Sequence, residues 1–259
     1  MRIATFNCNS IRVRLAAILE WLDEFAPDVL ALQETKVVDK DFPAAEIADR
    51  GWHVVYRGEK SYNGVAMICR EKPSAYSFGL GDDAGESETR LARVTVGGVT
   101  VVNTYIPQGQ DLASDKFAFK LGWLGRLRRY FDERSNGATD KLVWVGDLNV
   151  APLAIDVFDS KAVWPDVCHC QEAIDALEGV TSFGFVDIFR KFIPEPDNFT
   201  FWDYRPRGAL SRNLGWRIDH ILATSAMAEL ATACHVDVEP RKRERPSDHT
   251  FVYADFNPL

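Results

Sequence analysis

Three features are missing from this chain of 259 residues: a long hydrophobic run, an excess of basic residues and a cysteine framework. No run approaches the roughly 18 apolar residues of a membrane-spanning helix, and the first residues turn polar too early for a signal peptide. The five cysteines are an odd number without framework spacing, which favours reduced thiols in the cytoplasm. We therefore expect neither a membrane protein nor a disulfide-stapled secreted domain.

Positive charge is also scarce. The chain has 30 Lys and Arg residues against 38 Asp and Glu residues, a formal net charge of -8. Net charge alone thus makes nucleic acid an unfavourable partner. The basic residues are unevenly spread, however: Arg205, Arg207, Arg212 and Arg217 have no acid between them, and a second basic run covers 241–245. A charge run is usually only a solvated face, but these two could form a local phosphate-binding surface.

The tripeptide Cys168-His169-Cys170 looks like a fragment of a metal site. No second ligand pair with the spacing of a zinc site follows it along the chain. We therefore expect two buried thiols beside a partly exposed histidine.

Apolar stretches of strand length alternate with helical periodicity from end to end. Apolar residues recur every three or four positions in 15–25 and 117–131, which predicts two amphipathic helices. Gly97-Gly98 separates two strand candidates and predicts a hairpin turn. The expected strands are 3–6, 29–32, 54–56, 65–69, 91–96, 100–103, 142–145, 218–223 and 251–256. Because hairpins and helices are mixed without a repeat or a Pro-rich linker, we expect one α+β domain over 1–259, with mostly antiparallel sheets.

Polar side chains recur at the ends of these hydrophobic strands. They are Asn7, Asn9, Gln33, Glu34, Asn103, Tyr105, Gln108, Asp147, Asn149, Asp219, Asp248 and His249. A rigid strand can hold such groups in place, and carboxylates gathered with amides suit a hard cation such as Mg²⁺. Each residue alone has an ordinary alternative, such as a surface acid, a turn, a helix cap or an ion pair of Asp219 with Arg217. Their joint appearance at strand ends is what indicates a site.

These residues stand in longer stretches that follow one another along the whole chain. The stretches are 3–12, 27–36, 62–66, 103–109, 146–152, 200–205, 213–220 and 247–249. Together they resemble the exonuclease III family of apurinic/apyrimidinic (AP) endonucleases, within the endonuclease/exonuclease/phosphatase superfamily. One stretch is only moderately specific, but the series covers positions 3 to 256 in the family's order.

The resemblance implies a four-layered α/β sandwich, in which two mixed, mostly antiparallel sheets pack face to face with helices outside. It implies hydrolysis of the phosphodiester 5′ to abasic sites in duplex DNA, with Mg²⁺ or Mn²⁺ as cofactor. It also implies 3′–5′ exonuclease and 3′-phosphodiesterase activity on blocked 3′ ends. The corresponding expectation is a cytoplasmic monomer, acting on chromosomal DNA in a bacterial- or archaeal-type cell.

The resemblance further implies a role for individual residues. The implied metal ligands are Glu34, Asn7, Asn9 and Asp248. The implied catalytic residues are Asp147, Asn149, His249, Tyr105 and Asp219. The implied DNA contacts are Gln108, Arg90, Lys116, Arg205, Arg207, Arg212 and Asn213. The implied wall of an abasic-sugar pocket is Phe201, Trp202, Leu214 and Trp216, although core packing is the ordinary alternative for such aromatics.

General chemistry agrees with the implied catalytic roles. Asp147 would deprotonate the attacking water with Asn149 beside it, while Tyr105 and a His249 oriented by Asp219 would donate to the phosphate. An ordinary aspartate is a weak base, so we expect orientation and a nearby metal to assist it. An abasic nucleotide is easily extruded from the base stack into an apolar pocket.

Two other functions stay open at this point. One is a phosphodiesterase of the same superfamily that acts on a non-DNA phosphoester, and the Trp/Phe residues and the Arg cluster argue against it. The other is a catalytically silent regulator that binds nucleic acid, and the intact set of acids and His249 argues against that. The segment 203–212 differs among relatives with different exonuclease strength, so the balance of endonuclease and exonuclease activity stays open.

Overall fold

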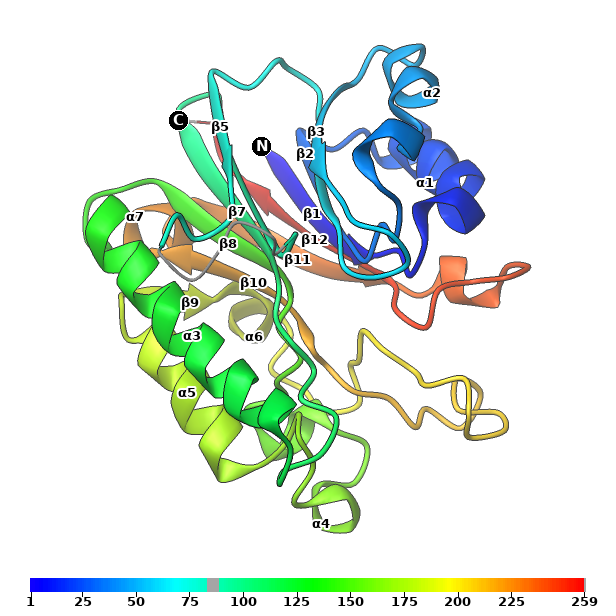
Figure 1. Ribbon diagram of the computed structural model, residues 1–259, viewed down its shortest axis with the longest axis vertical. Helices are drawn as coiled ribbons and strands as arrows, with labels where there is room; N and C mark the ends of the chain where they lie inside the picture. Colours follow the sequence, from blue (N-terminus) through cyan, green and yellow to red (C-terminus); the bar gives the residue numbers. More distant parts are fainter. Residues whose placement is uncertain (83–88, 259) are drawn as a thin grey trace.

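Two sheets of six strands each pack face to face in the computed structural model, which describes residues 1–82 and 89–258 (Figure 1). The first sheet contains β1 (Arg2–Asn7), β2 (Val29–Gln33), β3 (His53–Arg57), β4 (Val65–Cys69), β11 (Ala231–Asp237) and β12 (Phe251–Phe256). The second contains β5 (Ala75–Phe78), β6 (Leu91–Val96), β7 (Val99–Tyr105), β8 (Leu142–Asp147), β9 (Phe185–Asp187) and β10 (Asp219–Thr224). Their orders are β11-β12-β1-β2-β4-β3 and β5-β6-β7-β8-β10-β9.

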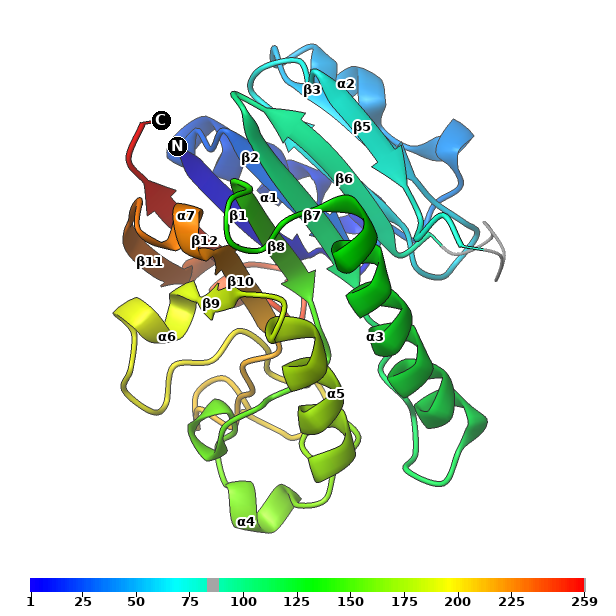
Figure 2. The ribbon, with the colours of Figure 1, turned by 90° about the vertical axis from the view of Figure 1, so that its left-hand side faces the viewer.

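Helices cover the two outer faces. Those beside the first sheet are α1 (Ile11–Phe25) and α2 (Ala44–Ala48), and the two that lie together over the second are α3 (Asp115–Arg134) and α5 (Gln171–Thr181) (Figure 2). The short helices are α4 (Ser160–Val163), α6 (Ile188–Phe192) and α7 (Ser225–Ala228), and the 3₁₀ turns are Asp39–Asp41, Ala154–Asp156 and Glu239–Lys242. The predicted four-layered sandwich is confirmed. No helix of the described ranges is long and apolar enough to span a membrane.

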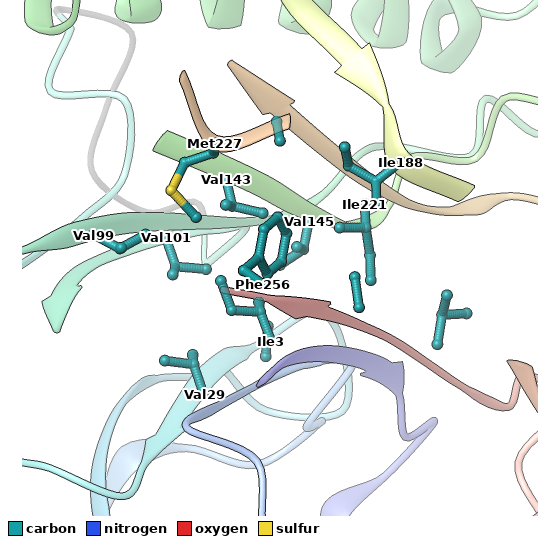
Figure 3. Packing of buried hydrophobic residues seen from close by; sticks show 14 of the residues in the cluster. Ile3, Val29, Val99, Val101, Val143, Val145, Ile188, Ile221, Met227 and Phe256 are labelled. Atoms are coloured by element: carbon teal, nitrogen blue, oxygen red, sulfur yellow. The ribbon is translucent and has the colours of Figure 1, made fainter. Parts of the chain in front are cut away.

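The space between the sheets is filled by β-branched and small apolar side chains. Ile3, Val29, Val143, Val145 and Ile221 are all fully buried and point into this space (Figure 3). Such residues suit a sheet that is covered on both faces. The result is a close-packed scaffold whose strand ends hold their positions.

Each sheet contains one parallel strand pair, and all its other pairs are antiparallel. Helix α1 connects β1 to the parallel β2, and α3 connects β7 to the parallel β8. Parallel neighbours end at the same edge, so Asn7 lies opposite Gln33 and Tyr105 opposite Asp147. Antiparallel β10 begins at the same place, with Asp219 opposite Asp147. This topology is why polar residues far apart in the sequence meet.

The predicted strands and helices agree with the structure, and the hairpin turn at Gly97-Gly98 is confirmed by the pairing of Val96 with Val99. Three strands were not predicted. Strand β5 is mostly exposed, β9 has only three residues, and β11 lacks a continuous apolar run. Short or exposed strands carry little hydrophobic signal, so periodicity alone does not reveal them.

The Cys168-His169-Cys170 segment is buried as a whole. Both thiols are free and buried, as predicted. The expected partial exposure of His169 is wrong, because its side chain is only 2% exposed. Its Nδ1 bonds to the carbonyl of Ala151 at 2.7 Å and its Nε2 to Ser160 Oγ at 2.8 Å. The tripeptide therefore supports a loop rather than contributing to the metal-site candidate found below.

Candidate active site

A cavity of about 250 Å³ opens where β2, β7 and β8 end. Glu34, Tyr105 and Asp147 line it from those strand ends. Its other lining residues are Gln108, Asn149, Asp166, Cys168, Phe201, Asp203, Arg205, Trp216, Ile218, Asp248 and His249. The structure thus brings most of the strand-end residues of the sequence together around one cavity.

Asn7 joins the two central acids of this cavity. Its Nδ2 donates to Glu34 Oε1 and to Asp147 Oδ2, both at 2.8 Å. Its Oδ1 accepts from the backbone N–H of Asn9 at 3.0 Å. Asn7 therefore holds the acids with its amide group in this structure, and its oxygen is already bonded.

His249 is held between two acids. Its Nδ1 bonds to Asp219 Oδ2 at 2.9 Å, and its Nε2 lies 3.7 Å from Asp147 Oδ2. Burial by itself lowers the pKa of His249, but Asp219 and Asp147 outweigh it and raise the pKa to about 10. The ring therefore carries two protons at neutral pH, with Nδ1 donating to Asp219 and Nε2 facing Asp147.

Asp147 is unusually basic for a carboxylate. Burial raises its pKa, and repulsion from Asp219 and Glu34 adds to this, while His249 and Asn7 oppose it; the result is about 7. A base works best when its pKa lies near the working pH. The sequence suggested a weak base that needs assistance, whereas the buried surroundings of Asp147 supply much of that assistance themselves.

Tyr105 lies at the other side of the acids. Burial, followed by the charges of Glu34 and Asp147, raises the pKa of its phenol well above 10. The hydroxyl therefore stays protonated and can donate. The Arg90 guanidinium lies 4.8 Å from the ring centroid of Tyr105 and donates to its backbone carbonyl at 3.1 Å, which fixes the ring.

Lys36 belongs to the site, although no role was predicted for it from the sequence. Its Nζ lies 2.7 Å from Glu34 Oε2 and donates to Asn9 Oδ1 at 2.5 Å. Burial tends to raise the pKa of Glu34, but Lys36 outweighs it and holds that pKa below its usual range. Its only signal in the sequence is its place two residues after Glu34. In the structure the backbone adopts positive φ at both residues, 52° at Glu34 and 56° at Lys36, and this brings Lys36 back to the carboxylate.

The acids form a candidate site for a divalent cation. One oxygen each of Glu34 and Asp147 and a nitrogen of His249 lie within 4.8 Å of one another. Asp248 also lines the cavity and accepts from Asn9 Nδ2 at 2.9 Å. Carboxylate oxygens are the ligands that Mg²⁺ and Mn²⁺ prefer, so the donor set fits such an ion. Both ring nitrogens of His249 face acids, Asp219 and Asp147, so the carboxylates are the better candidates for ligands of the ion.

Only two of the four expected pocket-wall residues line the cavity. Phe201 and Trp216 pair through backbone hydrogen bonds, and the Phe201 ring lies 4.8 Å from that of His249. Trp202 is only 2% exposed and packs in a separate cluster, against which Leu214 also packs. Ile218 and Cys168 also line the cavity, and neither was expected in its wall from the sequence.

The expected DNA contacts lie around the cavity in different settings. Gln108 and Arg205 line it, while Arg90 and Lys116 line an adjoining groove of about 590 Å³ that shares Gln108. The Arg205 side chain is 90% exposed and pairs with Asp203. Arg207 and Arg212 are exposed on the same loop. Asn213 is engaged inside the protein, since it accepts from Trp202 Nε1 and donates to the carbonyl of Asp197.

The two basic runs are less available than the sequence indicated. Arg217 is fully buried and pairs with Asp156 and Asp187, so its grouping with the surface arginines is wrong, and so is the alternative pairing with Asp219. In the run 241–245, Arg241 is buried and donates to the carbonyls of Ser247 and Trp202. The Arg217 guanidinium thus pairs with buried acids and that of Arg241 holds backbone carbonyls, and neither faces solvent.

The chain is similar to known proteins in both sequence and structure. Residues 4–249 match the Endonuclease/Exonuclease/phosphatase family. Its structure is similar to that of an AP endonuclease from Archaeoglobus fulgidus, with a TM-score of 0.96, 44% identity and 99% of each chain covered. It is also similar to a 3′ phosphatase from Neisseria bound to a product DNA hairpin, with a TM-score of 0.94, 39% identity and 99% of each chain covered.

A curated relative agrees with these structures. Exodeoxyribonuclease III of Haemophilus influenzae is 31% identical over 268 aligned residues, which cover 99% of this chain and 100% of the relative. The family match, the shared fold and the cavity at the strand ends all agree with the resemblance seen in the sequence. The chain therefore belongs to the Endonuclease/Exonuclease/phosphatase family.

Proposed function

We propose that this protein is a divalent-metal-dependent DNA repair nuclease that hydrolyses the phosphodiester 5′ to abasic sites in duplex DNA. The observation that carries the proposal is the charge arrangement of the cavity. A basic carboxylate, Asp147, faces a doubly protonated His249, and both are buried where β8 and β10 meet. Hydrolysis of a phosphodiester requires a base that activates water and a proton donor that stabilises the negative charge on the phosphate, and these two residues provide both.

The reaction follows from these positions. Asp147 takes a proton from a water molecule whose oxygen forms a new bond to phosphorus. Asn149, fixed by its own hydrogen bond to Asp147 Oδ1 at 3.0 Å, orients that water. His249 and Tyr105 donate to the phosphate oxygens as negative charge grows there. The bond from phosphorus to the 3′ oxygen breaks, that oxygen gains a proton, and the products carry a 3′ hydroxyl and a 5′ phosphate.

The proposed cofactor is Mg²⁺ or Mn²⁺. Glu34 would hold it, with Asp248 close by, and Asn7 and Asn9 would orient these acids. The bound ion supplies positive charge to the phosphate and the leaving oxygen. Lys36, whose Nζ lies 2.7 Å from Glu34 Oε2, also places a positive charge at this position.

The substrate follows from the wall of the cavity and its rim. We propose that Phe201, Trp216 and Ile218 receive the sugar of an abasic nucleotide, which is easily extruded from a duplex. The exposed Arg205, Arg207 and Arg212 contact the phosphates beside it, and Lys116 contacts them in the adjoining groove. Activity at blocked 3′ ends belongs to the same proposal, supported by the similarity to a 3′ phosphatase.

The oligomeric state and the cellular location are also part of the proposal. We propose a single domain that works as a monomer in the cytoplasm of a bacterial- or archaeal-type cell. The named relatives from Haemophilus influenzae and Archaeoglobus fulgidus support this setting. The five free, buried cysteines agree with a reducing compartment.

The test is cleavage of a labelled duplex with one abasic site, compared with an intact duplex, a 3′-recessed duplex and a phosphoinositide. In Mg²⁺ or Mn²⁺ we expect nicking 5′ to the abasic site, and none after addition of EDTA. A matched control is Asp132→Asn, an exposed acid on α3 that should cleave like wild type. Cleavage that persists in EDTA, or hydrolysis of the phosphoinositide alone, would overturn the proposal.

A further inference from the structure

Lys120 is a buried cation that the proposed reaction does not use. It lies on α3, its side chain is 0% exposed, and it forms no ion pair with any carboxylate of the described ranges. Its Nζ donates instead to three backbone carbonyls, those of Asn149 at 2.7 Å, Val167 at 2.5 Å and Gln108 at 3.2 Å. An ammonium group has three donors, so its hydrogen bonds are complete.

The three carbonyls belong to three different loops. Gln108 follows β7, Asn149 follows β8, and Val167 lies in the segment that leads to α5. Each loop also contributes a lining residue to the active-site cavity, namely Gln108, Asn149 and Cys168. Burying an ammonium group is costly unless strong hydrogen bonds replace its water. Lys120 therefore joins the three loops behind the cavity at one point.

Asn149 has the greatest need of such support. Its backbone lies in the left-handed region at φ 50°, which is strained for a residue other than glycine by about 1 kcal/mol or more. Its N–H donates to Asp147 Oδ1, and its side-chain Nδ2 donates to the carbonyl of Ile106 at 3.0 Å. Its Oδ1 accepts only a weak bond from Cys168 Sγ at 3.8 Å, and Lys120 holds its backbone carbonyl with a charged donor.

We propose that Lys120 is a positioning residue, which acts on hydrolysis by holding Asn149 in its strained backbone conformation beside Asp147. This inference rests on the proposed nuclease function for its kinetic consequence, but its structural part does not. Without the ammonium group, the peptide between Asn149 and Val150 is free to rotate, and the Asn149 amide leaves its place beside the attacking water. Loops 106–110 and 166–168 loosen with it, because they share the same anchor.

The variants separate this role from simple core packing. Lys120→Met keeps the length of the side chain and removes its donors. Lys120→Gln retains donors on a shorter neutral chain and replaces Lys120→Met if that variant does not fold. Leu124→Met is the matched control, since Leu124 is fully buried one turn further along α3 and packs among apolar residues.

The first measurement is hydrogen–deuterium exchange of the metal-free protein. Lys120→Met should exchange faster in 106–110, 148–152 and 166–169, while α3 itself stays protected, and Lys120→Gln should lie between it and wild type. Leu124→Met should match wild type in all three loops. Equal exchange in these loops for Lys120→Met and wild type would overturn the proposal, whatever the protein does to DNA.

The second measurement is a double-mutant cycle on abasic-duplex cleavage under single-turnover conditions. Lys120→Met should lower the maximal single-turnover rate by about 10- to 100-fold with little change in the half-saturating enzyme concentration, as losses of supporting hydrogen bonds do. If Lys120 acts through Asn149, the double variant Lys120→Met/Asn149→Ala should be no more than about threefold slower than Asn149→Ala alone. Multiplying effects would contradict this. A wild-type protein that cleaves no DNA would instead refute the proposed function and leave the exchange test intact.

Discussion

Two buried networks of charged residues lie near the ends of β8 and β10, and they have opposite electrostatics. In one, Asp156 accepts from Arg217 Nε at 2.6 Å and from Arg190 Nε at 3.0 Å, and Arg217 also pairs with Asp187. Burial tends to raise the pKa of Asp156, but Arg217 outweighs it and holds that pKa below its usual range. Every charge in this network faces an opposite charge.

The network around Asp147 is not balanced in this way. Asp147 faces two further acids, and the pKa values of Asp147 and His249 both shift far from their ordinary values, to about 7 and about 10. The buried histidines His220 and His249 make the same contrast. Burial and then Arg217 lower the pKa of His220 to about 4, whereas His249 is charged. Balanced charges stabilise a fold, while unbalanced ones indicate a site built for chemistry.

The largest effect that can test this contrast is loss of activity at His249. His249→Asn removes the charged donor, so cleavage of an abasic duplex in Mg²⁺ should slow by about 10²- to 10⁴-fold. His235→Asn is the control, because His235 lies exposed on β11, and its rate should equal that of wild type. An unchanged rate for His249→Asn in the same assay would show that the unbalanced network has no role in the reaction.

The next effect concerns the balanced network. Asp156→Asn leaves Arg217 buried beside a neutral partner, so the free energy of unfolding should fall by about 3–5 kcal/mol. Urea titration at pH 7 measures this, with Asp132→Asn as an exposed control that should change it by less than about 0.5 kcal/mol. A loss as small as that of the control would show that the network contributes little to the fold.

The two networks should also respond to pH with opposite signs in the metal-free protein. The folded pKa of Asp147, about 7, lies above its ordinary 3.8, so its stabilisation is present below pH 3.8 and is lost as pH rises through 7. Asp147→Asn should therefore exceed wild type in stability at pH 8, by on the order of 1–3 kcal/mol. The pKa of Asp156 is lowered, so its contribution is present above pH 3.8 and is lost on further acidification.

Urea titrations of both variants from pH 3 to pH 8 would check these signs. The advantage of Asp147→Asn over wild type should grow as pH rises, and the deficit of Asp156→Asn should shrink at the acidic end. The stability difference between variant and wild type should therefore change with pH in opposite directions for the two variants. Slopes of the same sign would contradict the contrast between the networks.

The smallest effect is expected at the exposed rim. Arg207→Ala should leave stability within about 0.5 kcal/mol of wild type and weaken DNA binding uniformly across sequences. The slope of log K against log salt should fall by about one, because one phosphate contact is lost. Measurement of binding at several salt concentrations in EDTA would show this, and an unchanged slope would exclude Arg207 from phosphate contact.

The sequence revealed the fold because hydrophobic runs mark the strands that both sheets bury, and it revealed the site because polar residues follow those runs. It did not distinguish Arg217 from Arg207, although both stand in the same basic run. Arg217 is two residues before β10 and faces Asp156, a partner 61 positions away, whereas Arg207 lies on an exposed loop. Such long-range pairing decides burial and leaves no local signal.

For the same reason, the sequence did not predict where the side chains of Lys36, Lys120 and Trp202 lie. Lysine is usually a surface residue, so nothing in the sequence marks Lys36 or Lys120. Only tertiary contacts place Lys36 beside Glu34 and Lys120 behind Asn149. Trp202 stands next to Phe201, but the extended backbone points the two rings to opposite sides, one to the cavity and one to a separate cluster. Neighbouring aromatics in a sequence therefore do not have to line the same pocket.

Single-turnover cleavage of an abasic duplex by Asp147→Asn in Mg²⁺ tests the central claim most directly. The variant should remain folded, since it loses a repulsive buried charge, while losing the base that deprotonates water. We predict a rate lower than that of wild type by about 10³-fold or more. A folded Asp147→Asn that cleaves within threefold of wild type would contradict the account.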